Sequence, residues 1–363
     1  MIKNKLESIM LIITLLLMLS GCENNQNVVN TITTSPPPTS DVTLTPEIAP
    51  TTESTATPIS LPTQTLQELS MKAYEKFMKN EMKVSFDRFM TKDYMEEALY
   101  NKGSGYTLSE LLHVVTSHYF KYSEKKKIDY MDYSYIDCGK DGVNELVLRF
   151  NGMDIYEEST LVYIIKYIEG KLSVCYYYET WSRSESTINE YGYYQSNGSN
   201  GASNHSEEYS VIDKDGNWQF IASIESELDI NQLSWSDELK QIPKVAEAKG
   251  ISGNIELITV CFDNNENVIN SSVDENKERF YTFKVYNDNW EPIKDENLYT
   301  NSIYKEIFDE ALVPFITPDE VSKMILKKEE KVGATAEIKE GAELTWKTFM
   351  EDFHHGVTWS DME

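Results

Sequence analysis

The sequence has few cysteines, few basic residues and no apolar run of membrane-spanning length. The chain of 363 residues contains four cysteines, and its 33 lysines and arginines are set against 60 acidic residues, a formal net charge of −27. Such a surface repels nucleic acid and anionic headgroups, so we expect no nucleic-acid partner. Cations, neutral sugars and basic peptides remain as ligands.

Recognisable catalytic motifs are also absent. The sequence contains neither G-x-S-x-G nor H-E-x-x-H. His113 and His118 are five residues apart and fall on different faces of a helix, and His354 and His355 are adjacent. Carboxylate pairs arise by chance among so many acids and identify no general acid or base. The sequence therefore assigns no catalytic residue and favours a non-catalytic protein.

The N-terminus carries a secretion signal. Lys3 and Lys5 precede an eleven-residue apolar run, Ile9 to Leu19, where a membrane span needs about 20 residues. The following Leu-Ser-Gly-Cys resembles the lipobox of bacterial lipoproteins. This resemblance implies that residues 1–21 are a cleaved signal peptide and that Cys22 carries a diacylglycerol, which anchors the protein to the outside of the cell membrane. The alternative is an ordinary secreted protein.

A low-complexity segment follows the anchor. Seven of the eleven prolines lie within residues 23–64, among many Thr and Ser, and this segment has no Lys, Arg, Gly or aromatic residue. Its composition cannot bury enough apolar area to offset the entropy of ordering. We expect residues 22–64 to be the lipidated cysteine and a disordered tether, and residues 65–363 to be globular, with a subdivision near 225–250 left open.

Periodicity in the globular region predicts an α+β fold. Capping boxes at Thr65 and Thr107 open helices, and a helical pattern also covers 86–99. Alternating apolar residues then predict strands joined by short turns, which form an antiparallel meander. The expected strands cover 128–136, 145–151, 160–168, 171–181, 188–195, 207–213, 217–224, 254–262 and 279–286. Helices are expected again at 303–312, from 317 onward and at 344–353.

The segment Tyr135–Phe150, YIDCGKDGVNELVLRF, raises the question of a calcium site. Asp137, Asp141 and Glu145 occupy ligand positions of an EF-hand loop that starts at Asp137. Gly139 and Leu148 stand where two further oxygen ligands belong, and strands flank the loop instead of helices. The sequence favours a turn between strands, with calcium at these three carboxylates as the alternative. No other cofactor is expected.

The same segment resembles a motif in uncharacterised lipoproteins of Gram-positive bacteria. In those proteins D-x-D/N-x-D-G-x-x-E-L accompanies a lipobox and a low-complexity tether, as D-x-G-x-D-G-x-x-E-L does here from Asp137 to Leu146. The resemblance covers the signal, the tether and residues 65–225. It implies a location and no particular activity, and Gly139 departs from the usual acid or Asn.

Two features suggest ligand binding. The polar segment Ser196–Glu208 is predicted to be a mobile loop between strands. Aromatic side chains are dense in the neighbouring strands, and such rings stack on sugars, although Tyr also suits a half-buried strand. The candidate ligand-binding residues are Tyr176, Tyr178, Trp181, Tyr193 and His205.

Three function classes follow from these observations. The leading hypothesis is a cell-surface lipoprotein with a non-catalytic binding or interaction module, whose ligand is a glycan or a peptide. The alternatives are an extracellular hydrolase acting on cell-wall or environmental polymers, and a calcium-stabilised structural surface protein. The expected partners are the membrane, through the lipid on Cys22, and the ligand.

Overall fold

In a computed structural model, the described residues are 64–87, 105–124, 127–153, 159–199, 201–228, 230, 239–251, 254–263 and 279–349. They belong to one compact unit of the chain, Pro62–Glu363. The predicted signal peptide, Cys22, residues 23–63 of the tether, most of the helix predicted within 86–99, and His354 and His355 lie outside the described residues.

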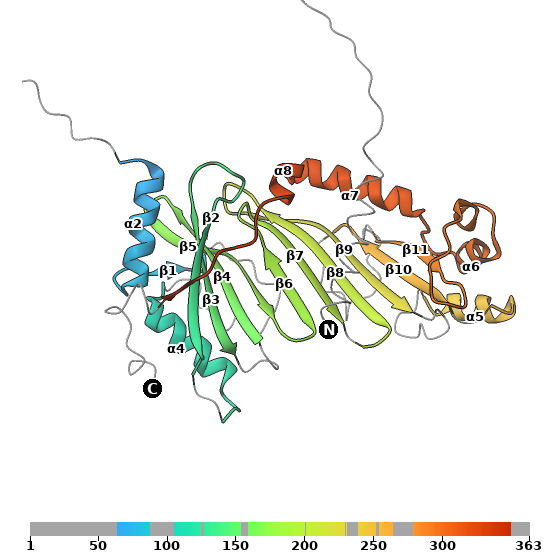
Figure 1. Cartoon of the computed structure of the whole chain (residues 1–363), viewed down its shortest axis with the longest axis horizontal. Helices are drawn as coiled ribbons and strands as arrows, with labels where there is room; N and C mark the ends of the chain where they lie inside the picture. The colour runs from blue at the N-terminus through green and yellow to red at the C-terminus, as the bar shows by residue number, and fades with distance from the viewer. Residues whose placement is uncertain are drawn as a thin grey trace, which may run out of the picture. The chain divides into compact units, whose positions relative to one another are not determined.

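Two six-stranded sheets form the body of this unit (Figure 1). The first, sheet A, has the order β1-β5-β4-β3-β2-β12, in which all neighbours except β1 and β5 are antiparallel. Its strands are β1 (Val84–Ser85), β2 (Tyr130–Ile136), β3 (Glu145–Met153), β4 (Ser159–Ile168), β5 (Lys171–Thr180) and β12 (Lys347–Thr348).

The second sheet, sheet B, is antiparallel throughout and follows chain order, β11-β10-β9-β8-β7-β6. Its strands are β6 (Ser184–Ile188), β7 (Tyr193–Ser199), β8 (Asn204–Ile212), β9 (Trp218–Leu228), β10 (Ile255–Cys261) and β11 (Arg279–Val285). The α+β meander that the sequence predicts is confirmed, and it is divided between two sheets at the β5–β6 connection.

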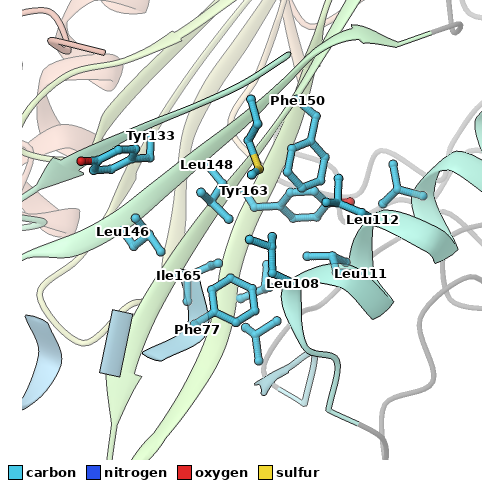
Figure 2. Close-up of a cluster of buried hydrophobic side chains, with 14 of the residues drawn as sticks. Phe77, Leu108, Leu111, Leu112, Tyr133, Leu146, Leu148, Phe150, Tyr163 and Ile165 are labelled. Atoms are coloured by element: carbon cyan, nitrogen blue, oxygen red, sulfur yellow. The ribbon is translucent and has the colours of Figure 1, made fainter. Parts of the chain in front are cut away.

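Two capped helices cover one face of sheet A. Helix α2 (Leu66–Met78) and helix α4 (Leu108–Tyr119) begin at Thr65 and Thr107 with both hydrogen bonds of a capping box, as predicted. Alternation along the strands brings large apolar side chains to this face. Figure 2 shows part of the resulting core, with Phe77, Leu108, Leu111, Leu112, Tyr133, Leu146, Leu148, Phe150, Tyr163 and Ile165.

The opposite face of sheet A packs against sheet B. Val147, Val162 and Ile164 of sheet A lie in one buried cluster with Tyr194 and Ile212 of sheet B. Strands β3 and β4 are therefore apolar on both faces, which explains their nearly continuous apolar runs.

Helices between β9 and β10 and after β11 complete two further clusters. One joins Leu257 and Phe283 of sheet B to Phe308, and the other joins Tyr193 and Val260 to Val321. The helices are α5 (Gln241–Ala248), the 3₁₀ turn η2 (Glu296–Tyr299), α6 (Ile303–Ala311), α7 (Pro318–Val332) and α8 (Ala336–Lys339). None of the helices among the described residues combines the length and apolar composition that a bilayer-spanning segment needs.

Two predictions for the region of strands β6 to β8 in sheet B are wrong. The strand predicted at 188–195 is split by a turn, because Gly192 has a φ of 86° and Asn189 accepts hydrogen bonds from the amides of Tyr191 and Tyr193. The polar segment Ser196–Glu208 is not a loop between strands: it forms the paired ends of β7 and β8 and the short turn between them.

The helix predicted at 344–353 is wrong over residues 344–348. Residues 341–348 are not helical and pair with β2 through Lys347 and Thr348, and helical backbone begins only at Phe349, the last residue described. We name residues 341–349 the C-terminal strap. The Thr345 carbonyl accepts a hydrogen bond from Ser134 Oγ at 2.9 Å, and Phe349 is buried in the core beneath sheet A. The apolar residues whose spacing suggests a helix here instead contact two different buried clusters.

Candidate functional site

The Asp137–Glu145 loop is closed by its own side chains. Asp137 accepts hydrogen bonds from the amides of Asp141, at 2.8 Å, and Gly142, at 3.0 and 3.1 Å. Asp141 in turn accepts one from the Val143 amide at 2.9 Å. These are the local bonds by which Asp stabilises turns. Both carboxylates are therefore used in holding the backbone of the loop.

Glu145 begins β3 and points away from the other two carboxylates, into the protein. Its side chain is fully buried, forms an ion pair with Lys166 of β4, and accepts a hydrogen bond from the Cys138 amide at 2.7 Å. Burial raises the pKa of Glu145 to about 7, although Lys166 and the Cys138 amide both favour its charged form. Burial lowers the pKa of Lys166, but Glu145 outweighs it and holds that pKa above the usual range.

The Glu145–Lys166 pair belongs to a larger buried polar cluster. Tyr74 Oη of α2 donates to the Asn144 carbonyl at 2.9 Å and accepts from the Tyr167 amide at 3.0 Å. Burial, followed by the charge of Glu145, raises the pKa of Tyr74. This cluster ties α2, the loop and β4 together and is closed to ligands.

The calcium candidates do not converge on one point. Asp137 and Asp141 serve the loop backbone at its exposed side, whereas Glu145 lies inside beside a lysine. Over the described part of the chain there is no group of three or more His, Cys, Asp or Glu side chains arranged to hold a metal ion. The loop geometry accounts for its acids without a cation.

The aromatic candidates are distributed over separate surfaces. Tyr178 and Tyr193 are 6% and 5% exposed and belong to different buried clusters. Tyr176 is half-buried and stacks on Trp218, with ring centroids 5.4 Å apart and planes at 8°. Tyr176 and Tyr178 therefore join the two sheets, and Tyr193 packs on the opposite face of sheet B.

The other two candidates lie elsewhere. Trp181 bridges to Ser184 in the turn between β5 and β6. His205 is exposed in β8, opposite Ser199 of β7. The structure therefore brings the predicted aromatic set and the 196–208 segment into no common groove.

An open groove with a volume of about 470 Å³ lies beside the start of α4. His113, Glu110 and Lys83 line it. Glu110 accepts a hydrogen bond from the Thr107 amide at 2.8 Å and pairs with Lys83 at 3.0 Å, and the cap and the lysine lower its pKa. That carboxylate is held in its charged form by a structural role, so the groove offers no poised acid to act with His113.

A surface that the sequence analysis missed lies at the end of β11. The turn Asn287–Glu291 carries Trp290, which is 57% exposed and has a φ of 61°. Tyr286 lies beside it, with ring centroids 6.2 Å apart and planes at 46°. Tyr286 Oη donates to Glu256 at 2.6 Å, and Lys284 lies 3.6 Å from that carboxylate. Here an exposed aromatic pair adjoins polar groups.

The signal for this surface was present in the sequence as Asn-Asp-Asn-Trp-Glu. Asn and Asp mark a tight turn, and a large aromatic residue is unusual at its tip. The turn is readable from these residues, but the exposure of Trp290 is not, because it depends on the tertiary fold. Comparison of the chain with models of known protein families, with characterised proteins and with solved structures finds no match.

Proposed function

We propose that the protein is a lipid-anchored binding module on the outer face of a bacterial cell membrane, with a glycan or peptide ligand and no catalytic role. The observation that carries the binding function is the Trp290–Tyr286 pair, which keeps a large aromatic surface in water on a folded, capped scaffold. Exposed aromatic surface rimmed by polar groups is characteristic of recognition sites.

The location rests on the N-terminal sequence. Lys3, Lys5, the apolar run Ile9–Leu19 and the Leu-Ser-Gly-Cys site support export and lipidation of Cys22. Two acyl chains hold a protein at a bilayer firmly, whereas one chain binds it reversibly. The acidic balance of the chain supports ligands that are neutral or basic.

The test uses the full-length protein purified from the membrane fraction in detergent. Mass spectrometry of the N-terminal peptide is expected to show a diacylglyceryl group on Cys22, and Cys22→Ala is expected to abolish membrane retention. The same preparation, applied to glycan and peptide arrays, is expected to bind members of one of these classes. An unmodified Cys22 in the membrane fraction contradicts the anchor, and an absence of binding on both arrays contradicts the binding module.

A further inference from the structure

We infer that the Asn287–Glu291 turn is a carbohydrate-binding site that stacks Trp290 on an uncharged pyranose ring. This inference rests on the proposed binding function and names the ligand class and the site. It is carried by the backbone of the turn, the surroundings of the ring and the charge of its flanks.

The chain contains a second turn of the same construction, which shows what residue the Trp290 position normally requires. In the turns Asp213–Asn217 and Asn287–Glu291, the first side chain accepts hydrogen bonds from the amides two and four residues later, at 2.9 to 3.0 Å. The fourth residue is Gly216 in one, with a φ of 78°, and Trp290 in the other, with a φ of 61°. Each donates its amide to the carbonyl of the first residue at 2.9 Å.

A tryptophan at this position is unfavourable in two ways. A positive φ strains any residue with a Cβ, and a bulky one is a genuine outlier there. The ring also keeps more than half of its residue surface in water, at 57% exposure. Glycine satisfies the turn at Gly216 without either cost. Leu312 combines a φ of 60° with 88% exposure as well, but at Trp290 the exposed residue is an aromatic ring that lies beside a second ring, Tyr286. This exposed ring pair, on a strained turn, points to a surface for contact with a ligand.

A peptide ligand fits this place poorly. Peptides commonly add a strand to a free sheet edge. The edge of β11 is already engaged, because the Tyr281 amide donates to the Pro314 carbonyl at 2.9 Å and the Ile316 amide donates to the Tyr281 carbonyl at 2.9 Å. The Ile293 amide likewise donates to the Val285 carbonyl at 2.8 Å. The main-chain groups of Tyr281 and the Val285 carbonyl are therefore occupied, which interrupts the edge that a peptide backbone would need.

A cationic ligand also fits poorly, because it needs rings arranged around a space. The rings of Trp290 and Tyr286 are 6.2 Å apart, within ordinary contact range, and leave no such space between them. The exposed indole ring of Trp290 by itself offers a flat aromatic surface, which matches the C–H face of a pyranose, with Tyr286 inclined at 46° beside it. Glu256 and Lys284, beside Tyr286, supply hydrogen-bond partners for the hydroxyl groups of a sugar.

The charged residues that flank the turn indicate which charge a bound sugar can carry. Acidic residues outnumber basic ones across 284–296, with Asp288, Glu291, Asp295 and Glu296 against Lys284 and Lys294. Together with the net charge of −27, this repels uronic acids and phosphate-bearing polymers. The ligand class is therefore a neutral hexose, pentose or N-acetylhexosamine glycan.

The experiment compares Trp290→Gly with the native protein. Because the Asp213–Asn217 turn accommodates Gly216, this variant is expected to keep or raise the melting temperature. The matched control is Leu312→Gly, which removes another exposed apolar residue, 88% exposed, at a φ of 60°. Leu312 ends α6 and lies outside the Asn287–Glu291 turn.

Binding is measured by calorimetry on the full-length protein in detergent, with cellohexaose, xylohexaose, mannohexaose and chitohexaose as neutral probes and hexagalacturonate as the acidic probe. At least one neutral probe is expected to bind, and Trp290→Gly is expected to weaken it about tenfold or more, as loss of an aromatic hot spot does. Leu312→Gly is expected to bind like the native protein, and hexagalacturonate is expected not to bind.

Several outcomes overturn the inference. Equal binding by Trp290→Gly and the native protein would show that Trp290 is not part of the binding site, and it would leave the proposed binding function standing. Binding of the acidic probe alone, or of array peptides alone, would contradict the assignment of a neutral glycan as the ligand. A large fall in the melting temperature of Trp290→Gly shows a structural role for the ring. If no probe and no array member binds, the proposed function fails as well.

Discussion

Two glycines in the Asp137–Glu145 loop share a backbone geometry and differ in their surroundings. Gly139 and Gly142 have φ values of 72° and 82°. A Cβ on Gly139 would lie 2.8 Å from the Lys214 amide nitrogen, whereas a Cβ on Gly142 would have no neighbour within 4 Å. The positive φ is strained for any other residue, but only Gly139 is also needed for close approach of two loops.

We therefore expect Gly142→Ala to lower the free energy of unfolding by about 1 kcal/mol, the cost of a left-handed residue. Gly139→Ala is expected to lower it by about 3 kcal/mol, since the backbone of Lys214 must also move. Urea unfolding of the two variants measures the difference. Equal losses of unfolding free energy would show that the Lys214 backbone moves away from the added Cβ at no measurable cost.

The buried carboxyl of Glu145 makes stability depend on pH. Its pKa is about 7 in the folded protein against 4.5 for an ordinary glutamate, so the folded state holds a proton that the unfolded chain has released between these values. Stability then falls as the pH rises from 4.5 to 7, by up to about 1.4 kcal/mol per pH unit and roughly 3 kcal/mol in total.

Glu145→Gln does not titrate and serves as the reference. We expect the unfolding free energy of the native protein, minus that of Glu145→Gln, to decrease across this interval. Chemical unfolding at pH 4.5, 5.5 and 7 measures it. A difference that grows with pH would mean that the ion pair with Lys166 outweighs the cost of burying the carboxylate.

At the scale of an element, the loop is expected to need no metal. Asp137 already holds the amides of Asp141 and Gly142. Adding a chelator, or millimolar calcium, should change the melting temperature by less than about 1 °C. Asp137→Ala should cost about 1 kcal/mol by removing the hydrogen bonds that close the exposed side of the loop. A rise of several degrees with micromolar calcium, lost in Asp141→Asn, would restore the calcium hypothesis.

The C-terminal strap contributes through one buried side chain. Phe349 is 1% exposed and packs with the core of sheet A, while Lys347, two residues earlier, is exposed. Phe349→Ala is expected to lower the unfolding free energy by about 3 kcal/mol and Lys347→Ala by less than about 0.5 kcal/mol. Thermal unfolding of both variants tests this. Similar small losses would show that the strap is dispensable for stability.

Helices and strands can be predicted from the sequence when the residues that determine them lie close together in the chain. Thr65 and Thr107 predict helix starts because a capping box lies within four residues. β3 is predictable because Leu146, Leu148 and Phe150 alternate toward one core.

Other elements depend on neighbours that are distant in the sequence. The Ser, Asn and Gly residues at the ends of β7 and β8 have low strand propensity, and they form strands because β6 and β9 pair on either side. The Glu145–Lys166 pair joins two strands through their register, which periodicity alone does not give. The exposure of Trp290 and the burial of Tyr193 are likewise results of the tertiary fold.

At the scale of the whole molecule, the N-terminal segment is expected to be separable from the body. Residues 23–61 are rich in Pro, Thr and Ser and contain no aromatic residue, and the described residues belong to a separate unit, Pro62–Glu363. Deleting residues 23–61, with Cys22 retained, should leave the melting temperature within about 1 °C of the native value. Differential scanning calorimetry of the two proteins in detergent measures this. A fall of several degrees would show that the segment contributes to the folded body.

The C-terminal strap also has a consequence for the order in which the chain folds. Sheet B consists of strands paired in chain order, and most of its turns are short, so its hairpins can close as soon as they emerge. The edge strand β2 instead receives its last partner from the strap, and the bond from Ser134 to Thr345 spans 211 residues. Until residues 341–349 have emerged and paired, this edge of sheet A stays open to pairing with other chains. The interval between emergence of β2 and emergence of the strap is therefore when the protein is most exposed to aggregation and proteolysis.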